Sequence, residues 1–230
     1  MSMIRVANLT FGYEGSYEDV FENVSFQMDT KWKLGLIGRN GKGKTTLLHL
    51  LMGKYPYKGE ISTNAFFDYF PYQVQQTERS AVDVLEEMDP QYEFWKVMRE
   101  MNDLHMSEDL LFRPFQTLSY GERTKIELAV LFAKENAFLL LDEPTNHLDV
   151  EGRKIVADYL NQKQGFILVS HDRAFLDGCV DHILSINRNS IEVQKGNFSS
   201  WYENKKRKDQ FELAENAKIK KELKHLREAS

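Results

Sequence analysis

Residues 34–51 read LGLIGRNGKGKTTLLHLL: a short apolar run, a glycine-rich loop and an apolar helical pattern. The loop, GRNGKGKT at 38–45, matches the spacing G-x-x-x-x-G-K-[ST] between a strand and a helix. Glycines let the backbone fold around phosphate groups with its N–H groups pointing inward, and the helix start adds positive potential. The stretch therefore predicts a phosphate-binding loop in an α/β domain. Its strand–loop–helix context disfavours a chance glycine-rich turn.

Each position of this loop has an expected contact. Lys44 is expected on the β- and γ-phosphates of a nucleotide, and the Thr45 hydroxyl is expected to ligate Mg²⁺. The other positions expected to bind the nucleotide are Gly38, Arg39, Asn40, Gly41, Lys42, Gly43 and Thr46.

A second informative stretch is LLLDEPTNHLD at 139–149, in which three leucines run into two adjacent acids. Successive side chains on a strand point to opposite faces, so the two acids cannot do the same job. Asp142 is predicted to hold Mg²⁺, through water. Glu143 is predicted to face the γ-phosphate and to act as the base that orients and deprotonates water. The alternative for Glu143 is a solvated acid at a strand end.

The rest of the chain alternates strand and helix patterns, which favours an α/β domain with a largely parallel sheet. An antiparallel β region is expected within 3–28 and a small helical lobe around 80–130. The expected strands are 3–9, 22–28, 34–37, 61–70, 138–142 and 166–170, with a hairpin over 181–187 and 190–196. The expected helices are 45–52, 80–104 with an interruption at Pro90, 123–134 and 203–228.

Composition limits the class of protein. The 230 residues carry a formal charge of −5, which argues against a basic nucleic-acid binder as a whole. The single cysteine, Cys179, cannot form an internal disulfide and is expected to be a small buried residue. The N-terminus lacks a signal pattern, and no apolar run approaches the roughly 20 residues that span a bilayer. These features predict a cytoplasmic protein without membrane insertion.

Two further motifs complete an ordered set. LSYGE at 118–122 precedes a helix, and ILVSHD at 167–172 is a strand that ends in a histidine. The order GRNGKGKT, LSYGE, LLLDEP, SHD resembles the ATP-binding cassette ATPases over residues 1–198. DEPTNHLD at 142–149 is similar to the ABC-F subfamily, and most to its antibiotic-resistance (ribosomal protection) members. Tyr120 and Glu122, which replace a second glycine and a glutamine of the commoner signature, are compatible with that subfamily.

This resemblance implies a P-loop NTPase fold of the ABC nucleotide-binding type, with an antiparallel β subdomain and a small helical subdomain. It implies ATP and Mg²⁺ as cofactors and an ATPase activity. Tyr13 would stack on adenine, with Tyr17 as the reserve candidate, and His171 would contact the γ-phosphate. Ser119 and Gly121 would cap the γ-phosphate of another cassette, so a complete site would need a second cassette, in the same natural chain or in a head-to-tail dimer.

Three positions need a separate interpretation. The family usually places a glutamine directly after a proline to reach Mg²⁺, whereas YFPYQVQQ puts Tyr72 there. Gln73, one residue later, is assigned this metal role, with water or Gln75 as the alternatives. His147 is interpreted as structural or as part of the interface between cassettes, and Asp149 lies in the segment that crosses between cassettes in the family.

The last segment, 199–230, differs in composition. Residues 203–228 hold nine Lys/Arg and six Asp/Glu, with an apolar stripe at Ile219, Leu223 and Leu226. This pattern ends abruptly at Ser230, which predicts the start of a helical linker to a second cassette, reaching into ribosomal RNA or tRNA. The protein would then be a translation factor or a resistance protein. The alternative is the ATPase subunit of a membrane transporter. A DNA-repair type cassette is disfavoured because the long coiled coil or zinc insertion of that class is missing.

Overall fold

The computed structural model describes residues 3–38, 41, 43–187 and 190–228. The side chains of Glu212 and of residues 216–228 are outside this description. Arg39, Asn40 and Lys42 of the predicted phosphate loop, and the side chains of the stripe Ile219, Leu223 and Leu226, therefore lie outside the described residues.

A six-stranded sheet with the strand order β5-β6-β7-β3-β8-β9 forms the centre of the fold. β5, β6, β7, β3 and β8 run parallel, and β9 pairs antiparallel with β8. The strands are β3 (Lys33–Gly38), β5 (Phe66–Phe70), β6 (Ala137–Asp142), β7 (Phe166–Val169), β8 (His182–Ile186) and β9 (Ile191–Lys195). The predicted strands at 34–37 and 138–142 belong to this one sheet, so their carboxyl ends lie at the same edge.

A smaller antiparallel sheet with the order β2-β1-β4 is formed by β1 (Met3–Phe11), β2 (Phe21–Asp29) and β4 (Lys58–Ser62). It confirms the antiparallel region expected near the N-terminus. The prediction of one strand over 61–70 is wrong, because the chain leaves this sheet after Ser62 and enters the other sheet at Phe66. The Thr63 hydroxyl accepts the N–H of Ala65 at 3.0 Å, a local turn that ends β4.

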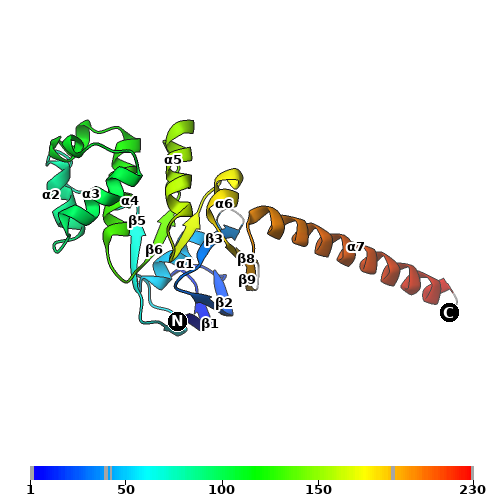
Figure 1. Cartoon of the computed structure of the whole chain (residues 1–230). Coiled ribbons are helices and arrows are strands. Elements are labelled where there is room, and N and C mark those ends of the chain that lie inside the picture. The colour runs from blue at the N-terminus through cyan, green and yellow to red at the C-terminus, as the bar shows by residue number, and fades with distance from the viewer. Residues whose placement is uncertain (1–2, 39–40, 42, 188–189, 229–230) are drawn as a thin grey trace.

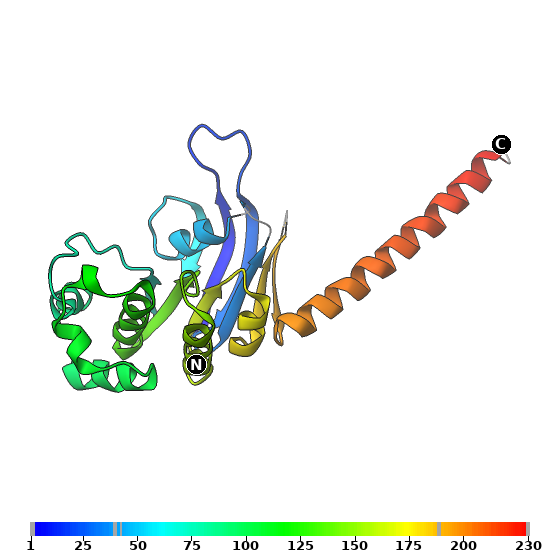
Figure 2. The same ribbon diagram turned by 90° about the horizontal axis from the view of Figure 1, so that it is seen from above.

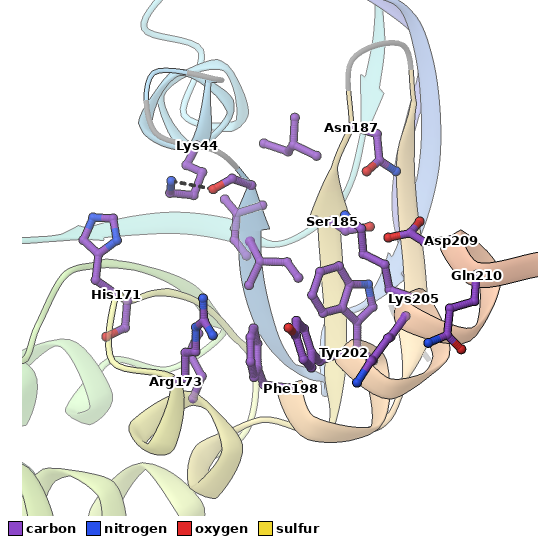
Figure 3. Close-up of a pocket in the computed structure, with 18 of the residues that line it drawn as sticks. Lys44, His171, Arg173, Ser185, Asn187, Phe198, Tyr202, Lys205, Asp209 and Gln210 are labelled. Atoms are coloured by element: carbon purple, nitrogen blue, oxygen red, sulfur yellow. Dashed lines mark hydrogen bonds between the residues drawn. The ribbon is translucent and has the colours of Figure 1, made fainter. Parts of the chain in front are cut away.

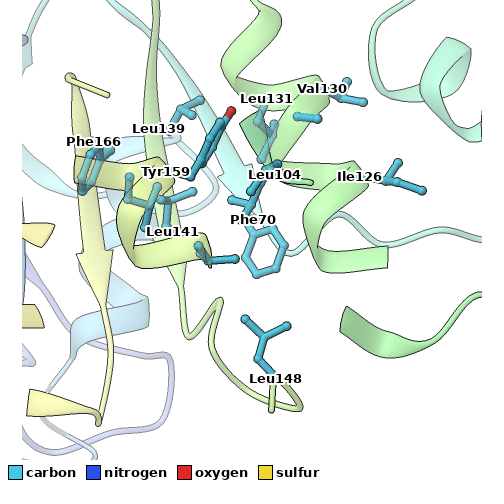
Figure 4. Close-up of a cluster of buried hydrophobic side chains, with 14 of the residues drawn as sticks. Phe70, Leu104, Ile126, Val130, Leu131, Leu139, Leu141, Leu148, Tyr159 and Phe166 are labelled. Atoms are coloured by element: carbon cyan, nitrogen blue, oxygen red, sulfur yellow. The ribbon is translucent and has the colours of Figure 1, made fainter. Parts of the chain in front are cut away.

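The helical lobe contains α2 (Ala81–Met88), α3 (Phe94–Asp103) and α4 (Tyr120–Ala133), with two short 3₁₀ turns at Glu108–Phe112 and Phe115–Thr117. The interruption predicted at Pro90 separates α2 from α3. α4 begins before the predicted start at 123, because Ser119 and Glu122 form a capping box: each side chain accepts the other's backbone N–H. Apolar side chains of this lobe and of the central sheet pack together, among them Leu104, Ile126 and Leu141 (Figure 4).

Three more helices flank the central sheet: α1 (Lys44–Leu51), α5 (Val150–Asn161) and α6 (Arg173–Cys179). α5 and α6 were not predicted. Each starts at an aspartate whose side chain accepts a backbone N–H of the first turn, Asp149 from Gly152 at 2.7 Å and Asp172 from Phe175 at 3.1 Å. These N-caps are the sequence signals that could have located both helices.

The last helix, α7 (Phe198–Glu228), begins five residues before the predicted start at 203. In both views it projects from the side of the sheet opposite the helical lobe (Figures 1 and 2). Its base is attached to the body, because Phe198 and Trp201 pack against the core and the Ser199 N–H donates to Asp177 at 2.7 Å. Within the described residues, no helix combines the length and the apolar character that crossing a membrane requires.

Candidate functional site

The glycine-rich loop joins the end of β3 at Gly38 to the start of α1 at Lys44. Gly43 has φ of +94°, and a Cβ there would lie 2.6 Å from a methyl group of Val20. Both the left-handed backbone and this close packing require glycine. Gly43 thus allows α1 to begin at the carboxyl edge of the central sheet, where the first N–H groups of a helix can stabilise an anion.

Hydroxyl groups from α1 and β5 meet at the carboxylate of Asp142. The Thr45 hydroxyl donates to Oδ2 at 2.8 Å, and the Tyr69 hydroxyl on β5 donates to the same atom at 3.1 Å. Burial, followed by the nearby Asp142 charge, raises the pKa of Tyr69, so Tyr69 stays a neutral donor. The Lys44 ammonium donates to the Gly38 carbonyl at 3.1 Å. Oxygen donors such as Thr45 and Asp142 are the ligands that Mg²⁺ prefers.

Tyr69 was missed by the sequence analysis. Its role depends on the parallel pairing of β5 with β6, in which Tyr69 lies beside Leu140. A pairing between strands about seventy residues apart carries no local sequence signal.

Glu143 turns away from Asp142 and toward the end of β7. Its φ of +54° is a left-handed conformation, uncommon for a residue with a side chain. His171 approaches its carboxylate twice, with Nε2 3.3 Å from Oε1 and with a backbone N–H that donates to Oε2 at 3.3 Å. Oε1 is buried and makes no hydrogen bond among the described residues. Burial raises the pKa of Glu143, although the His171 N–H and charge act in the opposite direction.

Tyr13 lies close to α1. Its hydroxyl shares a hydrogen bond of 2.7 Å with the Thr46 hydroxyl, and its ring packs edge-on against Phe11 and Tyr55. Nearly half of Tyr13 remains exposed, whereas Tyr17 is fully exposed. Of the two tyrosines considered for adenine stacking, Tyr13 is the one that these contacts hold near the phosphate loop.

Among the described residues, Thr45 and Tyr69 hydrogen-bond to Asp142, and Gln73 does not. Gln73 and Gln75 are both exposed. A cavity of about 350 Å³ borders Asp142 and Glu143, and among its lining residues are Tyr72 and Val74 from this loop. The Tyr72 hydroxyl donates to Glu87 in α2 at 2.9 Å, so the side chain after Pro71 points into the helical lobe.

The signature residues Ser119 and Gly121 lie at the start of α4. Ser119 caps this helix, and a Cβ on Gly121 would lie 3.3 Å from Leu148. Neither residue lines the cavity of about 960 Å³ beside Gly38 and Lys44 or the cavity of about 350 Å³ beside Asp142 and Glu143. His147, with φ of +69°, packs its ring 5.0 Å from that of Tyr120.

A larger cavity, of about 960 Å³, extends from the phosphate loop to the base of α7. Figure 3 shows Lys44 and His171 on one side of it and Tyr202, Lys205 and Gln210 of α7 on the other. The Arg173 guanidinium lies over the rings of Phe198 and Tyr202, at 5.6 and 5.9 Å. The segment that carries His171 therefore contacts the helix that leaves the domain.

The sequence of this chain is similar to those of ABC transporter family proteins. A family model described as ABC transporter matches residues 21–146. The ABC transporter F family member 5 of Arabidopsis thaliana is 29% identical over 214 residues, which are 88% of this chain and 30% of that protein. The ribosome protection protein VmlR of Bacillus subtilis (strain 168) is 34% identical over 200 residues, which are 83% of this chain and 35% of that protein.

Solved structures agree on the fold. A metal-chelate type ABC transporter in an inward-facing conformation contains a chain similar to this one, with a TM-score of 0.71 and 25% identity, covering 85% of this chain and 84% of that one. The chain spans about a third of the length of the two curated relatives above.

Proposed function

This chain belongs to the ATP-binding cassette (ABC transporter) family as a nucleotide-binding domain of the ABC-F type, and on that premise we propose that it binds Mg-ATP and hydrolyses it. One observation carries the proposal: Thr45, at the end of the phosphate loop, donates to Asp142 at 2.8 Å. The next residue, Glu143, presents its carboxylate to His171. The glycine-rich loop, the Asp142 carboxylate and the partly buried Glu143 carboxylate thus lie at one edge of the sheet, which supports a site for a nucleotide, a metal ion and a base.

The residues present fit a Mg²⁺ ion. Thr45 and Asp142 would hold it, and Tyr69 would orient the Asp142 carboxylate, as outer partners of metal ligands commonly do. When bound, the ion neutralises charge on the β- and γ-phosphate oxygens. Gln73 was predicted as a further ligand, and the described geometry lends it no support.

Glu143 is the proposed base. Its carboxylate would accept a proton from water as the water oxygen bonds to the γ-phosphorus and the bond to the β–γ bridging oxygen breaks. Burial raises the pKa of Glu143. A base whose pKa lies nearer to the working pH transfers protons more efficiently. Lys44 and the N–H groups of the loop would hold the phosphates in line, and His171 would hold both the carboxylate and the γ-phosphate.

Complete sites require a second cassette in this proposal. Ser119 and Gly121 sit at the N-terminus of the 14-residue helix α4, which suits a phosphate. By the resemblance to the ABC cassettes, these two residues would cap the nucleotide on the partner cassette.

The proposed place of action is the ribosome, in the cytoplasm. The name of VmlR, a ribosome protection protein, supports this extension. α7 supports it too, since residues 203–228 carry nine Lys/Arg against six Asp/Glu in an otherwise acidic chain. Phosphate-rich RNA attracts such a segment in a salt-dependent manner. Residues 199–230 would then begin the linker that joins two cassettes.

A pelleting experiment distinguishes this proposal from a transporter subunit. Protein carrying Glu143→Gln, with a second cassette present, is sedimented with ribosomes and separately with membranes, with and without ATP. We expect ATP-dependent enrichment with ribosomes, which Lys44→Ala abolishes. Enrichment with membranes instead would favour the ATPase subunit of a transporter.

A further inference from the structure

Glu127 on α4 is a buried carboxylate to which the nucleotide chemistry above assigns no role. It is 7% exposed, and its Oε2 accepts the backbone N–H of Tyr72 at 3.2 Å. The nearby guanidinium of Arg123 is directed elsewhere, donating to the carbonyls of Leu118 at 3.0 Å and Gln116 at 2.7 Å. A carboxylate is costly to bury, so its contact with Tyr72 requires an explanation.

The position of Tyr72 supplies one. This residue follows β5 directly and lines the cavity of about 350 Å³ that Asp142 and Glu143 also line. Glu127 lines the same cavity from the side of α4. The hydrogen bond therefore joins the loop beside the metal-side carboxylate to α4, the helix that Ser119 caps.

Farther along, the same loop is paired with the chain that leads into the signature motif. Three backbone hydrogen bonds connect the segments: Gln116 to Thr77 at 2.8 Å, Phe115 to Arg79 at 2.8 Å and Ala81 to Arg113 at 3.0 Å. Both ends of the loop after β5 are thus attached to α4 or to its approach.

We infer that Glu127 is a positioning residue that fixes the loop at 70–73 to α4, so that the loop beside Asp142 and the signature motif move as one body. The inference rests on the proposed Mg-ATP site for its functional consequence. Through this link, a movement of the signature motif on docking to a partner cassette would also move the loop beside the chain's own metal site. Burial raises the pKa of Glu127 to about 7, with the Tyr72 N–H and Arg123 acting in the opposite direction.

The first test measures amide hydrogen exchange at Tyr72. Glu127→Met keeps a similar volume and removes the acceptor, Glu127→Gln keeps an acceptor oxygen, and Thr124→Ala is the packing control from the same helix and cavity. Loss of the hydrogen bond predicts exchange about tenfold faster in Glu127→Met. Glu127→Gln and Thr124→Ala should leave the exchange rate within about threefold of wild type. Unchanged exchange in Glu127→Met, or equal acceleration in Glu127→Gln, would overturn the inference.

The second test titrates Mg²⁺ against binding of a non-hydrolysable ATP analogue. Glu127→Met should reduce the gain in nucleotide affinity that Mg²⁺ provides in wild type, and it should keep the wild-type affinity for metal-free nucleotide. Faster Tyr72 exchange with an unchanged Mg²⁺ dependence would overturn the functional part of the inference. If Glu127→Met does not melt cooperatively, Glu127→Gln decides, because a loss of Tyr72 protection there contradicts an acceptor role. If wild type binds no nucleotide, the proposed function fails, while the exchange data still decide on the contact between Glu127 and Tyr72.

Discussion

Nε2 of His171 lies 3.3 Å from Oε1 of Glu143, and the His171 backbone N–H reaches the other oxygen of the same carboxylate at 3.3 Å. The end of β7 thus holds the end of β6. Because β7 lies directly between β6 and β3 in the sheet, this contact fixes the Glu143 carboxylate relative to the phosphate loop.

Glu143→Gln should preserve ATP binding and remove most hydrolysis. Glutamine fills the same space but cannot accept a proton, and general base catalysis contributes on the order of 10²–10⁴ in rate. Phosphate release is measured with a second cassette present, and Glu151→Gln, on the exposed start of α5, serves as control. Normal turnover in Glu143→Gln would reassign Glu143 to a structural role.

Tyr69→Phe should weaken Mg²⁺-dependent nucleotide binding by roughly tenfold or more, because it removes one of the two donors that orient Asp142. The measurement is nucleotide affinity across a Mg²⁺ titration. Tyr57→Phe, a partly buried tyrosine beside the antiparallel sheet, should have little effect. An equal response of the two variants would show that the Tyr69 hydroxyl does not act through Asp142.

The buried Glu127 predicts that stability falls as the pH rises from 5 toward 7.5. Its pKa is raised from 4.5 to about 7 in the folded chain, so between these values the folded state binds the extra proton. The free energy of unfolding therefore decreases with rising pH, by up to about 3 kcal/mol from this group. The same cavity is lined by four other charged or titratable residues: Arg123, Asp142, Glu143 and His147. These residues are identical in wild type and in a Glu127→Gln variant, so a difference between the two proteins reports on Glu127.

Urea unfolding of wild type and Glu127→Gln at pH 5 and pH 7.5 measures this contribution. The glutamine variant should lack the Glu127 part of the decrease. Identical pH dependence in the two proteins would show that Glu127 is ionised over the whole range.

Local patterns were sufficient to predict the helix that follows the glycine-rich loop and the strand that ends at Asp142, because each is a contiguous run with its own period and glycine or acid signal. The split of 61–70 between two sheets was not predictable in this way, since apolar residues continue through the turn at Thr63. Tyr69 and Glu127 acquire their contacts from distant partners, Asp142 and the Tyr72 N–H. Gln73 was assigned by position in a motif, and in the structure it is exposed.

The central claim is that the loop at 38–46 binds the phosphates of Mg-ATP, and calorimetric titration of wild type and Lys44→Ala tests it most directly. Among the described residues of the loop, Lys44 carries the positive charge. Charge-assisted hydrogen bonds contribute about 1.5–3 kcal/mol each. The account predicts saturable binding of Mg-ATP to wild type and an affinity at least about tenfold lower in Lys44→Ala. Lys31→Ala, in the exposed turn before β3, should bind like wild type. Equal affinities of wild type and Lys44→Ala, or no binding to wild type, would contradict the account.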